Sequence, residues 1–388
     1  MSIARLIMKL VPQIMNTRVI TVRSSRGNSV AAAAKQGAEA LKAGQLVAFA
    51  TETVYGLAAL ATDRRSVDRL RKLKSRPRGP FSVHVSAPDE VRRYVENIPP
   101  RAEWLMGKTW PGPVTLLLDT GGKFPDKKLQ RVRGLYEELT SHDVIGLRCP
   151  DDPVARRILE QVPGAVIAPS ANRRGSRSPR SGEDVLATLE GKIDLLIDSG
   201  PARYGKDSSI VRIEGNNWKL LRKGVYDERV LGRYMRRKIA FVCTGNTCRS
   251  PMAAGLAKKH LSEWLRCRVG QLRSNGMEVL SAGLFVSNSS RPTPEAVQAA
   301  RQRDADIARH RSRKITYDLI KSCDTVFCMT ALHVEGVKRL AGEAAGVVFL
   351  LDEKRDIPDP IGGDQKTYEH TAEHIERALL GRIADGTL

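Results

Sequence analysis

The string C-T-G-N-T-C-R-S-P, Cys243 to Pro251, places a cysteine and an arginine at a spacing that suits chemistry on a phosphate group. A loop of this length can wrap its backbone N–H groups around one tetrahedral oxyanion, and the planar fork of Arg249 can hold two of its oxygens. These positive groups are expected to lower the pKa of Cys243, whose thiolate can then attack phosphorus. We therefore predict a nucleophilic Cys243, assisted by Arg249, in a phosphate-binding loop made of Thr244, Gly245, Asn246, Thr247, Cys248 and Ser250.

A second group of polar residues lies in the first half of the chain, at the ends of strand-like runs. This is where α/β folds build their sites. Several basic residues could converge there on a polyanion, while serine and asparagine side chains supply neutral hydrogen bonds. The basic residues are Lys74, Arg76, Arg148, Arg180 and Arg222, and the neutral ones are Ser170, Asn172 and Ser208. No string resembles a Walker loop, so we expect side chains rather than a glycine-rich cradle to hold any nucleotide.

The elements that must position these residues fall into two blocks, which we assign to domains 18–230 and 238–388. In the first block, helical runs lie between strands such as Q-L-V-A-F-A and V-T-L-L-L, which predicts a mixed, twisted α/β sheet. Residues 121–143 are basic and turn-rich and are interpreted as a long surface loop. The charged segment 226–238 is interpreted as a linker. After it, strands alternate with helices, which predicts a doubly wound parallel sheet.

The composition limits the classes of function that the chain can have. The 388 residues are 41% hydrophobic and 28% charged and contain no apolar run of the ~20 residues that a membrane helix needs. Residues 1–15 are interpreted as a ragged leader and not as a secretion signal. Six sparse cysteines favour a reducing, cytoplasmic location, and Cys323 and Cys328 bracket an apolar strand as buried thiols. The net charge of +21 favours anionic partners such as nucleotides, phosphoproteins or RNA, or simply a solubilising surface.

The second block resembles the low-molecular-weight protein tyrosine phosphatase family over essentially all of residues 238–388. The resemblance rests on the cysteine loop and on V-L-S-A-G-L-F (279–285), H-R-S-R-K-I-T (310–316) and D-I-P-D-P-I-G-G (356–363). It implies that Asp359, directly before a proline, is the general acid that protonates the leaving atom and later the base for water. Asp356 is the competing carboxylate, with loop capping as its other role. No cofactor is implied.

Two positions bear on the phosphatase substrate. Phosphotyrosine-directed members usually carry aromatic residues after the Asp-Pro, where this chain has Ile361 and Gly362. Thr247 resembles the protein-arginine phosphatase branch, because tyrosine-directed members have an aliphatic residue there. The resemblance therefore favours phosphoarginine over phosphotyrosine as the group on the phosphoprotein substrate. Cys248 is either a resolving thiol for an oxidised Cys243 or a packing residue of the loop.

The first block resembles the YrdC-like threonylcarbamoyl-adenylate synthases over residues 18–230. The resemblance rests on T-E-T-V-Y-G-L (51–57), K-S-R-P (74–77), W-P-G-P-V-T (110–115), P-S-A-N (169–172) and L-L-R-K-G (220–224). It implies that L-threonine, bicarbonate and ATP are joined to threonylcarbamoyl-AMP with release of pyrophosphate, for the threonylcarbamoyladenosine modification of tRNA. Mg²⁺ is expected to help neutralise the phosphates. The identity of any metal ligand stays unknown.

The same resemblance assigns roles to residues at matching positions. The ATP-binding set is Lys74, Arg76, Asn172, Arg180 and Arg222, and the threonine-binding set is Thr53, His84, Arg148, Ser170 and Ser208. The chain departs from the family pattern at Ala50, where proline is usual, and at Asp152, where histidine is usual. Arg173 and Arg174 replace small residues in S-A-N-R-R-G. The alternative is an RNA-binding module of this fold joined to a tyrosine phosphatase or to an arsenate reductase, which shares the cysteine loop.

Overall fold

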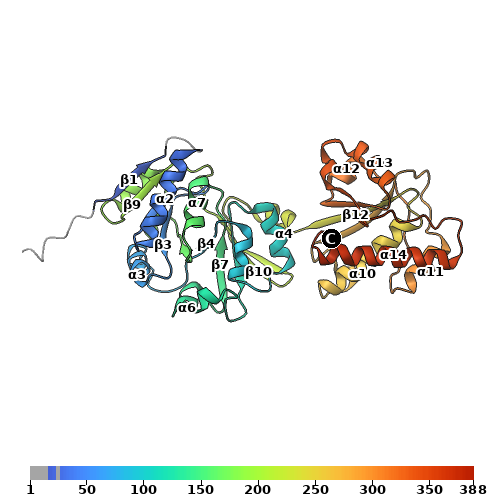
Figure 1. Cartoon of the computed structure of the whole chain (residues 1–388), viewed down its shortest axis with the longest axis horizontal. Coiled ribbons are helices and arrows are strands. Elements are labelled where there is room, and N and C mark those ends of the chain that lie inside the picture. The colour runs from blue at the N-terminus through green and yellow to red at the C-terminus, as the bar shows by residue number, and fades with distance from the viewer. Residues whose placement is uncertain (1–15, 23–26) are drawn as a thin grey trace, which may run out of the picture. The chain divides into compact units, whose positions relative to one another are not determined.

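Figure 1 shows a computed structural model of the chain, which describes residues 16–22 and 27–388. The leader predicted for residues 1–15 lies outside the described residues. The chain forms two compact units that divide between Met235 and Arg236. Among the described residues, no helix is both long enough and apolar enough to cross a membrane.

A mixed sheet forms the centre of the first unit, which confirms the predicted fold class. Its eleven strands follow the order β1-β9-β2-β3-β8-β4-β7-β5-β10-β11, and β6 pairs with β7. The sheet contains both parallel pairs, such as β4 with β7, and antiparallel pairs, such as β5 with β7. The strands are β1 (Arg18–Thr21), β2 (Val47–Phe49), β3 (Gly56–Leu60), β4 (Val83–His84), β5 (Val114–Asp119), β6 (Thr140–Ser141), β7 (Val144–Arg148), β8 (Val166–Ile167), β9 (Leu195–Asp198), β10 (Ser209–Glu214) and β11 (Asn217–Arg222).

Hydrophobic cores lie on both faces of this sheet. Val47 and Phe49 of β2 join the core beneath α2 and α7, whereas Ala48 between them joins the core on the other face. This alternation follows from the two-residue period of a strand, and it explains why β2 is apolar throughout. The helices of the unit are α2 (Asn28–Lys42), α3 (Arg64–Leu73), α4 (Pro100–Thr109), α5 (Lys127–Gln130), α6 (Leu135–Leu139), α7 (Pro153–Gln161), α8 (Gly182–Leu189) and α9 (Glu228–Tyr234), with a 3₁₀ helix at Pro88–Arg93.

Two segments of the first unit are more structured than the sequence suggests. The interpretation of residues 121–143 as a surface loop is wrong, because Leu129 of α5 and Leu135 and Leu139 of α6 are buried in the core. Charged residues separate these leucines, so the sequence of the segment is polar on average although its leucine side chains pack into the core. Likewise, the segment that we interpret as a linker contains α9, whose Leu231 joins the same core.

The second unit is a parallel sheet covered by helices on both faces, as predicted. Its strands follow the order β13-β12-β14-β15 and are all parallel. They are β12 (Arg237–Cys243), β13 (Met277–Gly283), β14 (Thr325–Cys328) and β15 (Val348–Leu350). Figure 1 shows α10 (Arg249–Trp264), α11 (Pro294–Arg301) and α14 (Gln365–Ala384) on one face, and α12 (Tyr317–Lys321) and α13 (Ala331–Ala341) on the other; 3₁₀ helices cover Val269–Gln271 and Gly342–Val347.

Candidate functional sites

The phosphate-loop residues of the second unit lie between the end of β12 and the start of α10. Cys243 is the last residue of the strand, and Arg249 is the first residue of the helix. Both are buried. The loop therefore lies at the positive end of a 16-residue helix, where free N–H groups and the helix dipole favour an anion.

The thiol of Cys243 is held inside this loop by hydrogen bonds. Its Sγ lies 3.0 Å from Ser250 Oγ and accepts the backbone N–H of Asn246 at 3.3 Å. Burial raises the pKa of the Cys243 thiol, and this effect outweighs Ser250, Arg249 and the Asn246 N–H, which all lower it. The expectation of a lowered pKa is therefore corrected for this arrangement of the loop. The reason is that burial removes water from around the sulfur, which disfavours the charged thiolate.

Asn246 is the residue that fixes the shape of the loop. Its backbone is left-handed, with φ of 57°, a conformation that asparagine tolerates better than most side chains. Its Nδ2 donates to Ser250 Oγ at 2.8 Å and to Ser281 Oγ at 3.0 Å. Its Oδ1 accepts the Arg313 N–H at 2.9 Å, and its carbonyl is 2.9 Å from His310 Nε2. One side chain thus ties the loop to β13 and to the segment that follows α11.

Arg249 reaches across the loop to the predicted acid. Its guanidinium donates to the Asp359 carboxylate, to Thr244 Oγ1 at 3.3 Å and to the Ile357 carbonyl at 3.2 Å. The Arg249 side chain is 5% exposed and that of Asp359 is 40% exposed. Asp359 therefore stands at the mouth of the loop, where it can exchange protons with both water and a bound phosphate ester.

Asp356, the competing carboxylate, has a structural partner. Its Oδ1 accepts the backbone N–H of Ala331 at 2.8 Å, at the first residue of α13. This contact is the capping role that we weighed against catalysis, since an N-terminal helix N–H has no partner within its own helix.

Two residues beside the loop were missed by the sequence analysis. His333 is buried, and its Nε2 lies 2.9 Å from Thr244 Oγ1 while its Nδ1 lies 2.7 Å from Thr330 Oγ1. Burial, aided by the charge of Arg249, lowers the pKa of His333 to about 4, so the ring is neutral at neutral pH. Phe285 donates its backbone N–H to the Thr244 carbonyl and is 77% exposed. It places an aromatic ring near the loop, although Ile361 and Gly362 supply none.

Three further thiols of the second unit, those of Cys248, Cys323 and Cys328, are buried. Cys248 is buried, with its Sγ 3.6 Å from Tyr368 Oη and 3.7 Å from Thr293 Oγ1. Burial raises the pKa of Cys323 to about 11 and that of Cys328 to about 12. Both are therefore protonated and shielded at neutral pH, which is unfavourable for a thiol relay.

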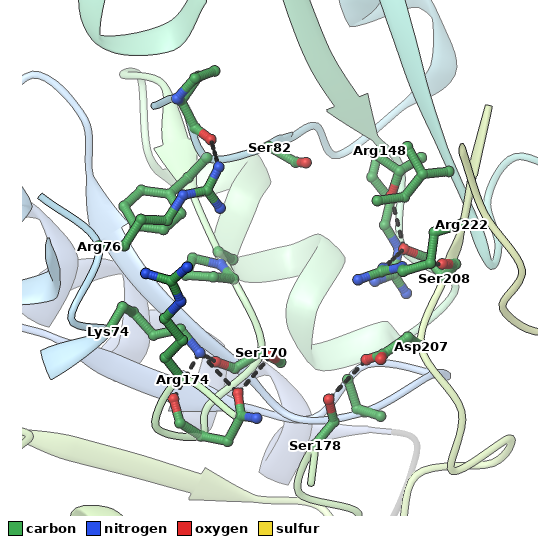
Figure 2. Close-up of a pocket in the computed structure, with 18 of the residues that line it drawn as sticks. Lys74, Arg76, Ser82, Arg148, Ser170, Arg174, Ser178, Asp207, Ser208 and Arg222 are labelled. Atoms are coloured by element: carbon green, nitrogen blue, oxygen red, sulfur yellow. Dashed lines mark hydrogen bonds between the residues drawn. The ribbon is translucent and has the colours of Figure 1, made fainter. Parts of the chain in front are cut away.

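The first unit contains a cavity of about 1020 Å³, shown in Figure 2. Most of the predicted site residues line it, from strand ends or from the loops that follow strands and helices. They are Lys74, Arg76, His84, Arg148, Ser170, Asn172, Ser208 and Arg222. Two predicted residues are not among those that line it. Thr53 contacts Arg148 behind the wall, and Arg180 uses its backbone N–H to bond the Asp184 carboxylate.

Lys74 is a buried cation on one wall of this cavity. It follows α3 directly, and its Nζ donates to the Ser170 carbonyl at 2.8 Å and to the carbonyl and Oδ1 of Asn172 at 2.6 and 2.8 Å. Burial, followed by the charge of Arg76, lowers the pKa of Lys74 to about 8. Its ammonium is thus held in place by neutral oxygens, while the charge of Asp207 acts on it without direct contact.

Arg76 lies beside Lys74 with its guanidinium 4.8 Å from the centre of the Phe81 ring. It donates to the Pro80 carbonyl at 2.8 Å. Partial burial lowers its pKa, and the neighbouring charges of Arg71 and Arg174 act in the same direction. Figure 2 shows Lys74, Arg76 and Arg174 together on one side of the cavity, facing Arg148, Ser208 and Arg222 on the other.

Arg148 is the buried cation of the opposite wall. It forms an ion pair with Glu52 at 2.9 Å and donates to Thr53 Oγ1 at 2.6 Å. Its Nε has no hydrogen-bond partner within the described part of the chain. Glu52, in the T-E-T string, thus holds Arg148 from behind the cavity lining, a contact that the sequence did not predict. Beside this pair, burial and the charge of Arg148 lower the pKa of His84 to about 3, so His84 is neutral.

The rest of this wall is built around Ser208. Arg222 donates to the Ser208 carbonyl at 2.9 Å and to its Oγ at 3.0 Å, and Ser208 Oγ lies 2.8 Å from Thr115 Oγ1. Asp207 also lines the cavity and accepts a hydrogen bond from Ser178 Oγ at 2.8 Å. The wall therefore combines one carboxylate with hydroxyl groups and a guanidinium.

The cavity can be tested for its fit to Mg²⁺. Residues 16–22 and 27–388 contain no group of three histidine, cysteine, aspartate or glutamate side chains that could hold a metal ion by themselves. Mg²⁺ at nucleotide sites needs fewer, because phosphate oxygens and water fill most of its coordination positions. Asp207, as the carboxylate of the cavity lining, fits a magnesium ion that arrives with a nucleotide.

Comparisons with known proteins give the two units separate relatives. A family model named for Sua5, YciO and YrdC and described as "Telomere recombination" matches residues 39–224. A second model, described as "Low molecular weight phosphotyrosine protein phosphatase", matches residues 238–384.

Individual relatives divide in the same way. Threonylcarbamoyl-AMP synthase of Pyrococcus abyssi is 32% identical over 57% of this chain, which spans 62% of that relative's length. A Methanocaldococcus jannaschii protein provisionally given the same name is 30% identical over 49% of the chain and 84% of its own length. Protein-arginine-phosphatase of Bacillus subtilis is 35% identical over 36% of the chain and 91% of its own length.

Proposed function

Because the chain belongs to the Sua5/YciO/YrdC family in its first unit and to the low-molecular-weight phosphotyrosine protein phosphatase family in its second, we propose that it is a bifunctional enzyme. Residues 18–230 form a threonylcarbamoyl-AMP synthase domain, and residues 238–388 form a protein phosphatase domain. The synthase product serves the threonylcarbamoyladenosine modification of tRNA, with tRNA or its modifying machinery as the partner. The enzyme acts in the cytoplasm.

The observation that carries the synthase proposal is the pairing of two differently built walls in one cavity. Lys74 and Arg76 are cations without carboxylate partners, and they suit the phosphates of ATP. Opposite them, His84, Ser208 and Arg148 offer a neutral imidazole, a hydroxyl and a guanidinium, which suit the amino acid L-threonine. Asn172 beside Lys74 and Arg222 on the opposite wall complete the proposed ATP-binding set, and Ser170, whose carbonyl accepts from Lys74, completes the proposed threonine-binding set.

The chemistry follows from these positions. The amine of threonine forms a bond to the carbon of bicarbonate, a C–O bond breaks and water leaves, which gives a carbamate. A carbamate oxygen then attacks the α-phosphorus of ATP, and the bond from that phosphorus to the pyrophosphate oxygen breaks. The cationic wall stabilises the charge that develops on pyrophosphate as it leaves. Mg²⁺ bound with the nucleotide would add to this neutralisation, with Asp207 as the carboxylate that could hold it. Arg180 and Thr53 would act only from outside the cavity lining, Thr53 through its contact with Arg148.

The observation that carries the phosphatase proposal is the close association of Cys243, Arg249 and Asp359 around one helix N-terminus. The Cys243 thiolate attacks phosphorus, and Asp359 gives its proton to the leaving atom as the phosphorus bond to that atom breaks. Water, deprotonated by Asp359, then attacks the phosphocysteine and releases phosphate. Arg249 exchanges its bond to Asp359 for the equatorial oxygens of the phosphoryl group.

Phosphoarginine is the substrate group that we favour. Thr247 lies in the loop with its hydroxyl 3.6 Å from Cys248 Sγ, and the positions after Pro360 hold no aromatic ring. The exposed carboxylate of Asp359 also suits a cationic guanidinium leaving group. Cys323 and Cys328 are buried, which is unfavourable for the thiol relay that an arsenate reductase needs.

Each activity can be tested by its product. The full chain is incubated with ATP, threonine and carbon-13 bicarbonate, and threonylcarbamoyl-AMP carrying the label is sought by mass spectrometry. Separately, kcat/KM is measured for phosphoarginine and phosphotyrosine peptides. Labelled product that requires threonine, together with faster hydrolysis of phosphoarginine, is the expected result. ATP turnover that ignores threonine would refute the synthase, and preference for phosphotyrosine would refute the arginine assignment.

A further inference from the structure

The loop that follows Asn172 has an unusual concentration of charge for its position. It reads R-R-G-S-R, residues 173–177, and carries Arg173, Arg174 and Arg177, all of them exposed. Among the residues that line the cavity, the structure includes Arg174 but neither Arg173 nor Arg177. Figure 2 shows Arg174 on the same wall as Lys74 and Arg76. One arginine of the three therefore faces the same space as the predicted ATP-binding cations.

The base of this loop is fixed to the site itself. Asn172 Nδ2 donates to the Ser176 carbonyl, and Ser176 N–H donates to the Arg173 carbonyl at 3.1 Å, which closes a turn around Gly175 at φ of 82°. Lys74 Nζ holds the carbonyl of Asn172 at 2.6 Å. The backbone that carries Arg174 is therefore positioned by the same lysine that lines the cavity.

Among the residues that the structure describes, the Arg174 side chain has no strong partner. Its guanidinium donates only one long hydrogen bond, at 3.5 Å, to the carbonyl of Ser75. The charge of Arg174 nevertheless helps to lower the pKa of Arg76. Burial of Arg76 and the charge of Arg71 have larger effects in the same direction. Two guanidinium groups thus share one small region and repel each other.

The carboxylate in the cavity lining, Asp207, acts on the charge of Lys74 but forms no ion pair with these cations among the described residues. Within residues 16–22 and 27–388, the ion pairs of the first unit do not include Lys74, Arg76 or Arg174, whereas nearby Arg71 pairs with Glu138 and Arg148 with Glu52. Three neighbouring cations that repel one another are best compensated by a ligand of several negative charges. A single carboxylate or monophosphate would leave most of the repulsion in place.

We propose that Arg174 is a third polyphosphate-binding cation of the synthase site, which acts with Lys74 and Arg76 on the β- and γ-phosphates of ATP and on the pyrophosphate that leaves. This inference deepens the proposed synthase function and rests on it. The bond that breaks transfers its electron pair to the terminal oxygen of pyrophosphate, and the planar fork of Arg174 can bind that charge.

The test measures binding to the full chain without turnover. Dissociation constants for inorganic tripolyphosphate, pyrophosphate and AMP are determined by calorimetry at one fixed ionic strength. The variants are Arg174→Ala, Arg173→Ala and Arg177→Ala, which each remove one positive charge from the same exposed loop. Arg174→Lys keeps the charge but loses the fork. Circular dichroism confirms that each variant is folded.

The expected result separates Arg174 from its neighbours. Arg174→Ala weakens tripolyphosphate and pyrophosphate about tenfold or more, because a hydrogen bond to a charged group is lost. It leaves AMP within about twofold, and Arg174→Lys lies between. Arg173→Ala and Arg177→Ala stay within about twofold for every ligand.

Several results would overturn the inference. If all three alanine variants lost the same affinity for these ligands, the loop would attract anions only through its total positive charge, as expected for an RNA-binding surface. No weakening by Arg174→Ala would show that the side chain is only a surface residue. A wild type that binds tripolyphosphate through Arg174 but forms no threonylcarbamoyl-AMP would leave the inference standing and refute the proposed synthase function instead.

Discussion

Replacement of Asn246 by alanine should destabilise the second unit more than any other single change in the phosphate loop. The side chain makes two buried hydrogen bonds, to Ser250 and Ser281, and a partly buried one from the Arg313 N–H. Each is worth about 1 kcal/mol, and the left-handed backbone at φ of 57° costs alanine about 1 kcal/mol more. We therefore expect a loss of about 4 kcal/mol in the free energy of unfolding. This is a large fraction of the ~5–15 kcal/mol that stabilises a typical domain.

Hydrogen exchange can read this loss in the full chain, because it reports each unit separately. Amides of β12, which ends at Cys243, should exchange up to about a thousandfold faster in Asn246→Ala, while amides of β2 in the first unit should not change. Asn246→Gly is the matched control, since glycine accepts the left-handed backbone but lacks the hydrogen bonds. It should be about 1 kcal/mol more stable than the alanine variant. A loss of less than about 1 kcal/mol in Asn246→Ala would refute the view that this side chain holds the loop together.

Three further predictions concern the pH dependence, the buried ion pair and the specificity. Because burial lowers the pKa of Lys74 to about 8, its charge is present below that pH and is lost above it, so ATP affinity should fall between pH 8 and 9.5. In Lys74→Arg the ATP affinity should not change over this pH range. The same fall in the variant as in the wild type would exclude Lys74 as the titrating group. Glu52→Ala should destabilise the first unit by about 3–5 kcal/mol in urea unfolding, because it leaves Arg148 buried without its partner, and Glu52→Gln should lose less; equal stabilities would show that the pair contributes nothing. Thr247→Ile should move the ratio of kcat/KM values from phosphoarginine toward phosphotyrosine by about 1–3 kcal/mol, and a constant ratio would make Thr247 an ordinary loop residue.

The parts of both sites that the sequence predicted are those set by local geometry. Cys243 and Arg249 are separated by one short loop, so their convergence follows from the strand before them and the helix after them. In the first unit, Lys74, Arg148 and Arg222 end a helix or a strand, and the ends of neighbouring strands in an α/β sheet meet at common edges.

The parts that the sequence did not predict depend on contacts between distant segments. Glu52 pairs with Arg148 and His333 contacts Thr244 only because the sheets bring separate loops together. A glutamate or histidine in those strings has no local signature of such a partner. The same reason explains residues 121–143, where buried leucines are spaced by charges and only the completed core reveals their inward side.

The pKa of Cys243 shows a related limit. Sequence spacing identifies the positive groups around the thiol but not how deeply the sulfur is enclosed. Burial opposes those groups and raises the pKa. The balance between burial and those positive groups therefore sets the pKa of the thiol, and only the folded structure gives that balance.

The claim that one chain carries two separate active sites is tested most directly by measuring both activities in two single variants of the full chain. Cys243→Ser should abolish phosphate release from phosphoarginine while threonine-dependent pyrophosphate release from ATP stays at the wild-type rate. Lys74→Ala should do the reverse. If either variant lost both activities, or if Cys243→Ser kept its phosphatase rate, the assignment of two independent sites to these residues would be contradicted.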